Sequence, residues 1–187
     1  MTWLDVEKET MRRIAAGEAV VDLRRCGIRD KGALIIAKTL IDTRNTKVTH
    51  INLWDNGIGD RGAMALAELI IAATDRTSSS SCSSSSPPPY QWRLNLRNNS
   101  IRNKGALALA EALEGNTTLT ELDLSHNPIS GRGVAALKRA VARSSRDGVL
   151  RHFNLQCTAP GQGDGFHAPG TNTGRDIGVS RNLSPES

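Results

Sequence analysis

The sequence predicts a repetitive α/β protein, because a short strand followed by a helix recurs along the chain. The clearest copy is residues 119–141, which read LTELDLSHNPISGRGVAALKRAV. In its first half leucines alternate with polar residues, as in a strand with one buried face. In its second half Val134, Leu137 and Val141 share one face of a helix. Elements this short cannot cover their own apolar faces, so we expect the copies to stack on one another.

Four copies are well formed, at residues 20–40, 48–69, 91–113 and 119–141, and a fifth at 150–158 is partial. The second strand leucine recurs at separations of 30, 43, 28 and 31 residues. Several columns recur together, which makes the repeat signal strong. These columns are Leu23, Leu53, Leu96, Leu124 and Leu155; Ile28, Ile58, Ile101 and Ile129; and Gly32, Gly62, Gly105 and Gly133.

The unit combines LxLxxN with a helix of the form [DN]-[KR]-G-A-x-x-[LI]-A, and it covers residues 20–158 apart from one insertion. This pattern resembles the leucine-rich repeat proteins of the ribonuclease-inhibitor type. The resemblance implies an α/β solenoid shaped as a horseshoe, with a parallel sheet on the concave side and helices on the convex side. It also implies four full repeats, a partial fifth and a protein-binding role. Cys26 and Thr158 depart from the pattern, since each stands where the family has asparagine.

Composition bounds the class of protein. A chain of 187 residues with 38% apolar content is one domain, and 3% aromatic residues predict an aliphatic core. Three cysteines without metal-like spacing favour a reducing compartment. The absence of a long apolar stretch and the early charges predict a cytoplasmic protein without a membrane span, with the nucleus as the alternative. The four histidines are scattered, so we expect no metal, no cofactor and no enzyme activity.

Three segments flank or interrupt the repeats. We expect residues 1–19 to form a helix that caps the first repeat, because the end of a stacked array must be covered. The serine- and proline-rich residues 74–89 are predicted to be a disordered insertion, which accounts for the separation of 43. Within and after it, Pro87, Pro88, Pro89 and Tyr90 resemble the PPxY peptide that WW domains bind; the alternative is a plain tether. Residues 159–187 are predicted to be a disordered glycine-rich tail.

The helix starts carry two further columns. Asp30, Asp60, Asn103 and Gly131 precede the glycine column by two residues, and all four are residue types favoured as helix N-caps. The residues that follow are basic and are expected to be solvated: Lys31, Arg61, Lys104 and Arg132. The glycine column predicts close packing at the corner between strand and helix, where a side chain would obstruct.

The candidate binding residues lie on the concave face, in the strand positions that vary between copies. Trp54 among several arginines has the composition of an interface hot spot. Residues 91–151 contain ten basic and five acidic residues, so we expect an acidic protein partner. Nucleic acid is not favoured, because no series of aromatic residues is available for stacking. The oligomeric state is left open. The predicted contact residues are Arg24, Arg25, His50, Trp54, Arg93, Arg97, Glu121 and Ser125.

The resemblance leaves two alternatives to a free-standing binding module. One is a GTPase-activating protein of the Ran-activator type, since those proteins use this repeat; Arg61 and Arg102 are the loop arginines available for such a role. The other is a repeat fragment of a NOD-like receptor.

Overall fold

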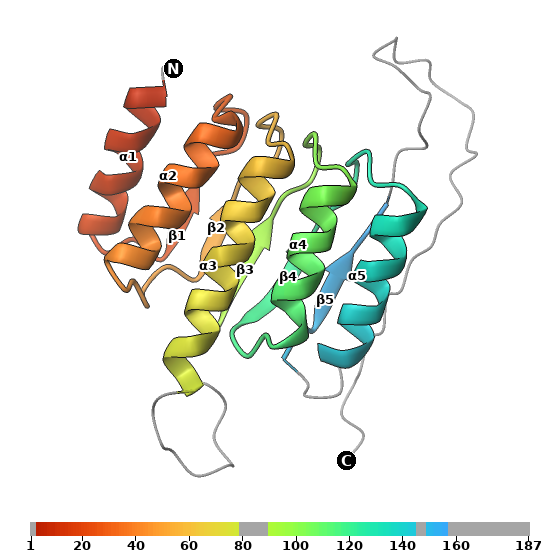
Figure 1. Ribbon diagram of the computed structural model, residues 1–187. Coiled ribbons are helices and arrows are strands. Elements are labelled where there is room, and N and C mark those ends of the chain that lie inside the picture. The colour runs from red at the N-terminus through yellow and green to blue at the C-terminus, as the bar shows by residue number, and fades with distance from the viewer. Residues whose placement is uncertain (1–2, 79–89, 145–148, 157–187) are drawn as a thin grey trace, which may run out of the picture.

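The structure is a computed structural model that describes residues 3–78, 90–144 and 149–156. Helices and strands alternate along the chain, and the strands form one parallel sheet in the order β1-β2-β3-β4-β5. Figure 1 shows the helices side by side over one face of that sheet. The elements are α1 (Trp3–Ala15), β1 (Val20–Asp22), α2 (Arg29–Asp42), β2 (His50–Asn52), α3 (Asp60–Ser78), β3 (Trp92–Asn95), α4 (Asn103–Glu114), β4 (Leu119–Asp123), α5 (Gly131–Ser144) and β5 (His152–Asn154).

The arrangement confirms the predicted α/β solenoid of stacked strand-and-helix units. The first repeat is β1 with α2, the second β2 with α3, the third β3 with α4 and the fourth β4 with α5, while β5 begins the partial fifth. The strand register also matches the sequence columns. Residues that face away from the helices pair directly across neighbouring strands: Val20, His50, Arg93, Glu121 and His152.

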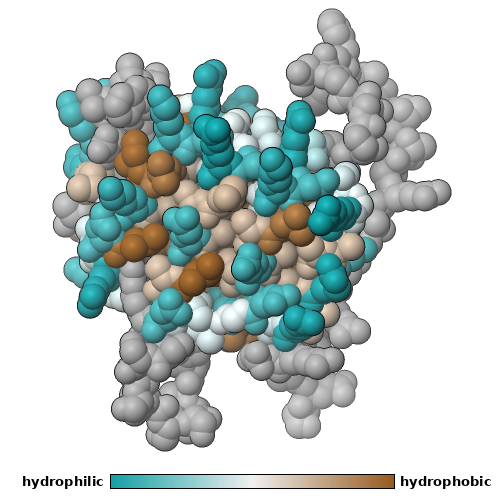
Figure 2. Space-filling model, viewed as in Figure 1, coloured by the Kyte–Doolittle hydropathy of each residue, from teal (hydrophilic) through white to brown (hydrophobic). Residues whose placement is uncertain are grey.

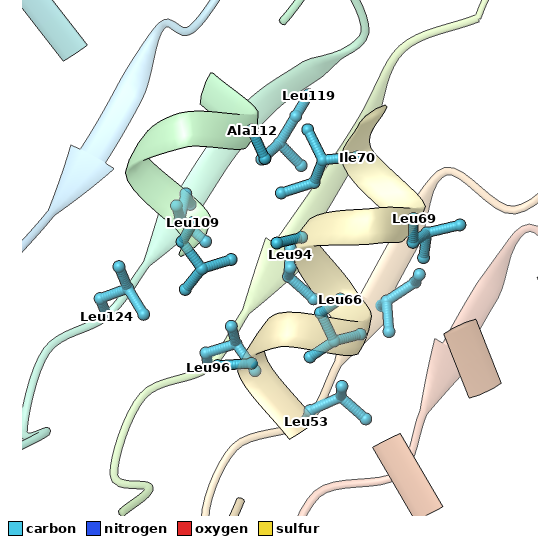
Figure 3. Packing of buried hydrophobic residues seen from close by; sticks show 14 of the residues in the cluster. Leu53, Leu66, Leu69, Ile70, Leu94, Leu96, Leu109, Ala112, Leu119 and Leu124 are labelled. Carbon is cyan, nitrogen blue, oxygen red and sulfur yellow. The ribbon is translucent and has the colours of Figure 1, made fainter. Parts of the chain in front are cut away.

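The core is aliphatic, and it lies between the sheet and the helices. Figure 3 shows Leu94 of β3 and Leu66 of α3 among leucines that neighbouring repeats contribute. Each strand directs one apolar row inward, which is why a strand of three to five residues suffices. Trp92 is the aromatic exception: it is 1% exposed, and its indole N–H donates to Thr118 Oγ1 at 3.2 Å.

The helix α1 packs against α2 and β1 at the start of the array. Ile14 is buried there, and the Arg13 guanidinium donates to the carbonyl of Asp22 in β1 at 3.2 Å. At the other predicted boundary, α3 continues to Ser78. Residues 74–78, which the sequence assigned to the insertion, are therefore helical. The rest of the insertion and the tail at 159–187 lie outside the described residues.

Buried asparagines join each repeat to the preceding one. The amide nitrogen of Asn99 donates to the carbonyls of Leu53 and Leu96, both at 3.0 Å. Its oxygen accepts from the backbone N–H groups of Asn56 at 3.1 Å and Ile58 at 3.0 Å. One side chain thus satisfies turn groups in two repeats, which explains the asparagine of the LxLxxN pattern. The equivalent side chains bond in the same way: Asn56 and Asn127.

The predicted N-caps act on the next helix in the array, not on their own helix. The Asp60 carboxylate accepts from the N–H groups of Arg102 and Gly105, both at 2.8 Å, and both groups belong to the start of α4. Asp30 does the same for the start of α3, and Asn103 for the start of α5. The residues at the N-cap positions of α2 and α4, Ile28 and Arg102, form no side-chain hydrogen bond to the start of their own helix. The capping prediction was therefore right about the residue type and wrong about the helix that is capped.

The glycine column confirms the predicted close packing. A Cβ on Gly105 would lie 2.8 Å from the Cβ of Ala63 and 2.9 Å from an Asp60 carboxylate oxygen. A larger residue would push α4 away from α3 and break the bonds from Asp60. Gly62 and Gly133 are equally enclosed in their own repeats.

Candidate interaction face

We call the side of the sheet that faces away from the helices the strand face; it corresponds to the predicted concave face. Alternation along each strand sends polar side chains to it, because successive residues point to opposite sides. Beyond the strand ends the ladder continues through the backbone bonds Arg25 N–H to Trp54 O and Asp55 N–H to Arg97 O. These bonds align the residues that follow β2 with those that follow β3, so Trp54 and Arg97 lie at equivalent positions just after adjacent strands.

Trp54 is partly exposed at the centre of a small polar cluster. The guanidinium of Arg25 lies 5.7 Å from the centroid of the Trp54 ring, within range of a cation–π contact. Arg25 also forms an ion pair with Asp55 at 3.2 Å, and Asp55 accepts a hydrogen bond from the amide of Asn98 at 3.0 Å. The cluster therefore places an indole ring and a guanidinium side by side.

The backbone at the end of each strand explains why these residues stand together. Arg25, Asp55, Asn98 and His126 occupy equivalent positions in successive repeats, and each has a φ between 55° and 57°. This left-handed conformation suits Asn and Asp better than Arg and His, since a short polar side chain can hydrogen-bond locally. The turn ends the strand and places four polar side chains along one margin of the strand face.

The strand face carries as many carboxylates as arginines. Arg24 pairs with Asp22 at 3.0 Å, and Arg93 pairs with Glu121 at 3.3 Å. Arg97 differs, because its guanidinium lies 3.4 Å from Nε2 of His126 and forms no ion pair with a carboxylate within the described residues. The basic surplus of residues 91–151 therefore does not lie on this face. Most of its members stand on helices: Arg102 borders α4, and Lys104, Arg132, Lys138, Arg139 and Arg143 belong to α4 and α5.

Two predicted contact residues are less available than expected. Ser125 is fully buried and donates its hydroxyl to the Asp123 carboxylate at 2.6 Å, so its side chain does not reach the strand face. His50 is partly buried, with Nδ1 2.9 Å from the hydroxyl of Thr49. The remaining predicted residues stand on the strand face or its margin: Arg24, Arg25, Trp54, Arg93, Arg97 and Glu121.

The residues that the sequence reasoning missed are the carboxylates and the amide that position the arginines. Asp55 and Asn98 follow Arg25 in the same column, so the column itself was the available signal. Asp22 precedes Arg24 by two residues and therefore shares its side of the strand. Charge counting along the chain hides such pairs, because it does not separate the faces of the protein.

The predicted WW-type peptide falls mostly outside the described residues, which exclude Pro87, Pro88 and Pro89. Tyr90 is described, and it belongs to the fold: its hydroxyl donates to the carbonyl of Val48 at 2.6 Å, and its ring packs against the core. Arg61 and Arg102, which the GTPase-activator alternative requires, are both exposed at helix starts. That alternative stays a prediction.

In the described part of the chain, no three or more His, Cys, Asp or Glu side chains are grouped so that they could hold a metal ion. Among the same residues, no helix has the length and apolar character needed to cross a membrane.

The chain has the fold of a leucine-rich repeat domain. Residues 44–67, 93–110 and 115–138 match the model of the Leucine Rich repeat family, and each match spans parts of a strand-and-helix unit. A solved structure titled Leiomodin-1 Actin-Binding Site 2 is similar, with 21% identity and a TM-score of 0.58 over 79% of this chain and 77% of that one. The tropomodulin C-terminal domain of Caenorhabditis elegans is also similar, with 11% identity and a TM-score of 0.61 over 82% and 84%.

These identities establish a shared fold and nothing finer. No curated protein matches the sequence. The leucine-rich repeat part of the resemblance is confirmed, whereas the ribonuclease-inhibitor subtype stays a prediction.

Proposed function

We propose that this chain is a non-catalytic protein-binding module that contacts its partner through the strand face. The observation that carries the proposal is Trp54, a partly exposed indole that lies beside the guanidinium of Arg25 and just after β2, at the position equivalent to that of Arg97 after β3. Tryptophan and arginine are enriched among the residues that dominate the energy of protein interfaces. A tryptophan adds a large contact area at a low cost in conformational entropy, because its side chain has only two rotatable bonds.

The charge distribution specifies what the partner should offer. Three arginines of the strand face already have carboxylate partners, whereas Arg97 has none among the described residues. We propose that the partner brings an apolar group to Trp54 and a carboxylate to Arg97. The partner is thus acidic at this contact point, without any need for a strongly acidic surface.

Actin is the first partner to test. The similar leiomodin-1 domain is titled an actin-binding site, and its likeness covers most of both chains. Filament co-sedimentation and monomer-binding assays with the full chain measure this directly. If actin does not bind, affinity purification with mass spectrometry on the same chain gives an unbiased set of partners.

The variant that tests the strand face is Trp54→Ala with Arg97→Glu. We expect binding of the partner to fall by about ten-fold or more, because truncating hot-spot residues costs about 2 kcal/mol or more each. The melting temperature should change little, since both side chains lie at the surface.

A matched control is Met64→Ala with Lys38→Glu on the helix side, which removes an exposed apolar side chain and makes the same change in net charge. This control should bind as the natural chain does. A partner that binds both double variants equally well does not use the strand face, and the proposal would then be wrong.

A further inference from the structure

A second basic surface lies along the edge where the helices begin. Figure 1 shows the N-terminal ends of α2, α3, α4 and α5 in a row, and Figure 2 shows hydrophilic side chains along the same edge. Each of the four full repeats contributes an exposed basic residue in the first turn of its helix. Two of them contribute a second one, at the first residue of α2 and just before α4. We call these residues the helix-start edge: Arg29, Lys31, Arg61, Arg102, Lys104 and Arg132.

The positive charges of the helix-start edge are not paired. Within the described residues, none of the six side chains forms an ion pair. Asp30 and Asp60 are the acidic residues at these four helix starts, and their carboxylates accept backbone N–H groups of the next repeat. Those bonds hold each carboxylate in the seam between two helices. The arginines of the strand face, by contrast, mostly have carboxylates beside them.

Basic residues outnumber acidic ones at this edge, where Asp30 and Asp60 are the acidic residues in the first turns of α2 to α5. At the opposite ends of the same helices both signs occur, as with Asp42, Glu114 and Arg143, and the last two form an ion pair at 3.1 Å. A general need for solubility would not separate the two ends of the helices in this way. The edge is also distinct from Trp54 and Arg97, so it goes beyond the contact surface proposed above.

The spacing of the charges favours an extended polypeptide. Neighbouring packed helices lie about 8–10 Å apart, so the edge offers one positive position about every 10 Å from α2 to α5. A chain in the extended polyproline II conformation advances about 3.1 Å per residue with three residues per turn, so acidic side chains at every third residue lie on one side and recur about every 9 Å, close to the spacing of the row. Single-stranded nucleic acid binds mainly where aromatic residues stack on its bases, and the six edge residues include none.

We infer that the helix-start edge is a docking surface for an extended acidic segment of a protein, with carboxylates spaced about three residues apart. The segment lies across the starts of α2 to α5 and pairs its carboxylates with the exposed basic side chains. Such contacts are electrostatic and exposed to solvent, so binding is fast and weakens with added salt. A partner seated on the strand face can reach this edge, because the ordered loops between them are short.

The test measures the binding of a fluorescent peptide of about ten residues with glutamate at every third position, the spacing expected for an extended chain in the polyproline II conformation. The edge variant is Arg61→Ala, Lys104→Ala and Arg132→Ala. The matched control is Lys38→Ala, Lys47→Ala and Arg139→Ala, which removes three exposed basic residues elsewhere. Fluorescence polarisation at low ionic strength gives the affinities, and circular dichroism confirms that every variant is folded.

Each exposed ion pair contributes little alone, so we expect the loss of three of them to weaken peptide binding by about ten-fold relative to the natural chain. The control changes residues outside the edge, and its affinity should change by less than about three-fold. The Trp54→Ala and Arg97→Glu variant should bind the peptide normally, which separates this surface from the strand face. Equal losses in the edge variant and the control would overturn the inference. So would tighter binding of a single-stranded oligonucleotide of equal charge, or equal binding of a peptide with its glutamates clustered.

Discussion

The central repeats and the terminal repeats of this solenoid differ in the side chains that join them to their neighbours. The second and third repeats carry both joining groups: a buried asparagine that bonds backward, as Asn99 does, and an acceptor at the helix start that bonds forward, as Asp60 does. The first repeat lacks the first group, since Cys26 takes the place of the asparagine. The fourth repeat lacks the second, since Gly131 takes the place of the acceptor.

Both departures occur at the ends of the described array of repeats. The helix α1, and not another repeat, packs against α2 and β1 on the side that an asparagine at position 26 would join. In the described part of the chain, no helix follows β5 for a residue at Gly131 to cap. The side chain at a repeat position is thus selected by the neighbour that it bonds, which agrees with the nearest-neighbour energetics of repeat proteins.

The largest effect should come from the central asparagine. Asn99→Ala leaves buried N–H and carbonyl groups of two repeats without partners, and each such group costs about 1–3 kcal/mol. We expect the free energy of unfolding to fall by about 3 kcal/mol or more. Urea unfolding followed by circular dichroism measures this loss.

The equivalent change at the terminal position provides the comparison. Within the described residues, the Cys26 side chain forms one weak hydrogen bond, from Sγ to the Arg24 carbonyl at 3.4 Å, and Cys26→Ala removes it. Its cost should stay below about 1 kcal/mol. Equal losses at Cys26 and Asn99 would show that the terminal repeat is joined as tightly as the central ones.

A second, smaller effect should come from the forward bond. Asp60→Ala removes two hydrogen bonds to a charged acceptor and should destabilise the protein by about 2 kcal/mol. Asp60→Asn should recover most of this loss, because Asn103 already performs the same role with an amide oxygen. Asp42→Ala removes an exposed carboxylate from the end of α2 and should change stability by less than about 0.5 kcal/mol. If Asp60→Asn is as unstable as Asp60→Ala, the charge and not the hydrogen bonding joins the repeats.

The sequence predicted the fold well because the columns repeat. The recurrence of Leu53, Leu96 and Leu124 with Gly62 and Gly105 determines both the strand register and the tight corners. Which helix start each carboxylate binds was harder to predict. A carboxylate at Asp60 is within reach of its own helix start and of the next one, and spacing along the chain does not distinguish the two.

The candidate site was predicted less completely, because it depends on which charges meet. The columns placed Trp54, Arg25 and Arg97 in one region. The structure brings the Arg25 guanidinium beside the Trp54 ring, whereas Arg97 contacts His126, and the role of these residues in binding stays a prediction. Ser125 was expected to be available at the strand face, but its side chain is buried and its hydroxyl donates to Asp123. The acidic character of the partner was inferred from a charge count over a segment whose basic residues stand mostly at the helix starts and on the helices. Only the three-dimensional structure shows that these basic residues and the strand face are different surfaces.

The smallest effect on stability should come from the helix α1, which covers the first repeat. This helix carries exposed ion pairs, whereas buried amides join the central repeats. Hydrogen bonds from Arg12 and then Arg13 lower the pKa of Glu9 from 4.5 to about 2. A carboxyl group whose pKa falls on folding contributes stability above its unfolded pKa and loses it as the pH falls through the folded value. The contribution of Glu9 is therefore complete above pH 4.5 and disappears toward pH 2.

Glu9→Gln should consequently lower the urea midpoint slightly at neutral pH, and the difference from the natural chain should shrink between pH 4.5 and 2. Other carboxylates titrate in both proteins, so the difference between them isolates Glu9. The effect is small because Glu9 and Arg12 are solvent-accessible and exposed ion pairs contribute little. A difference that stays constant down to pH 2 would mean that Glu9 acts through the packing of its side chain and not through its charge.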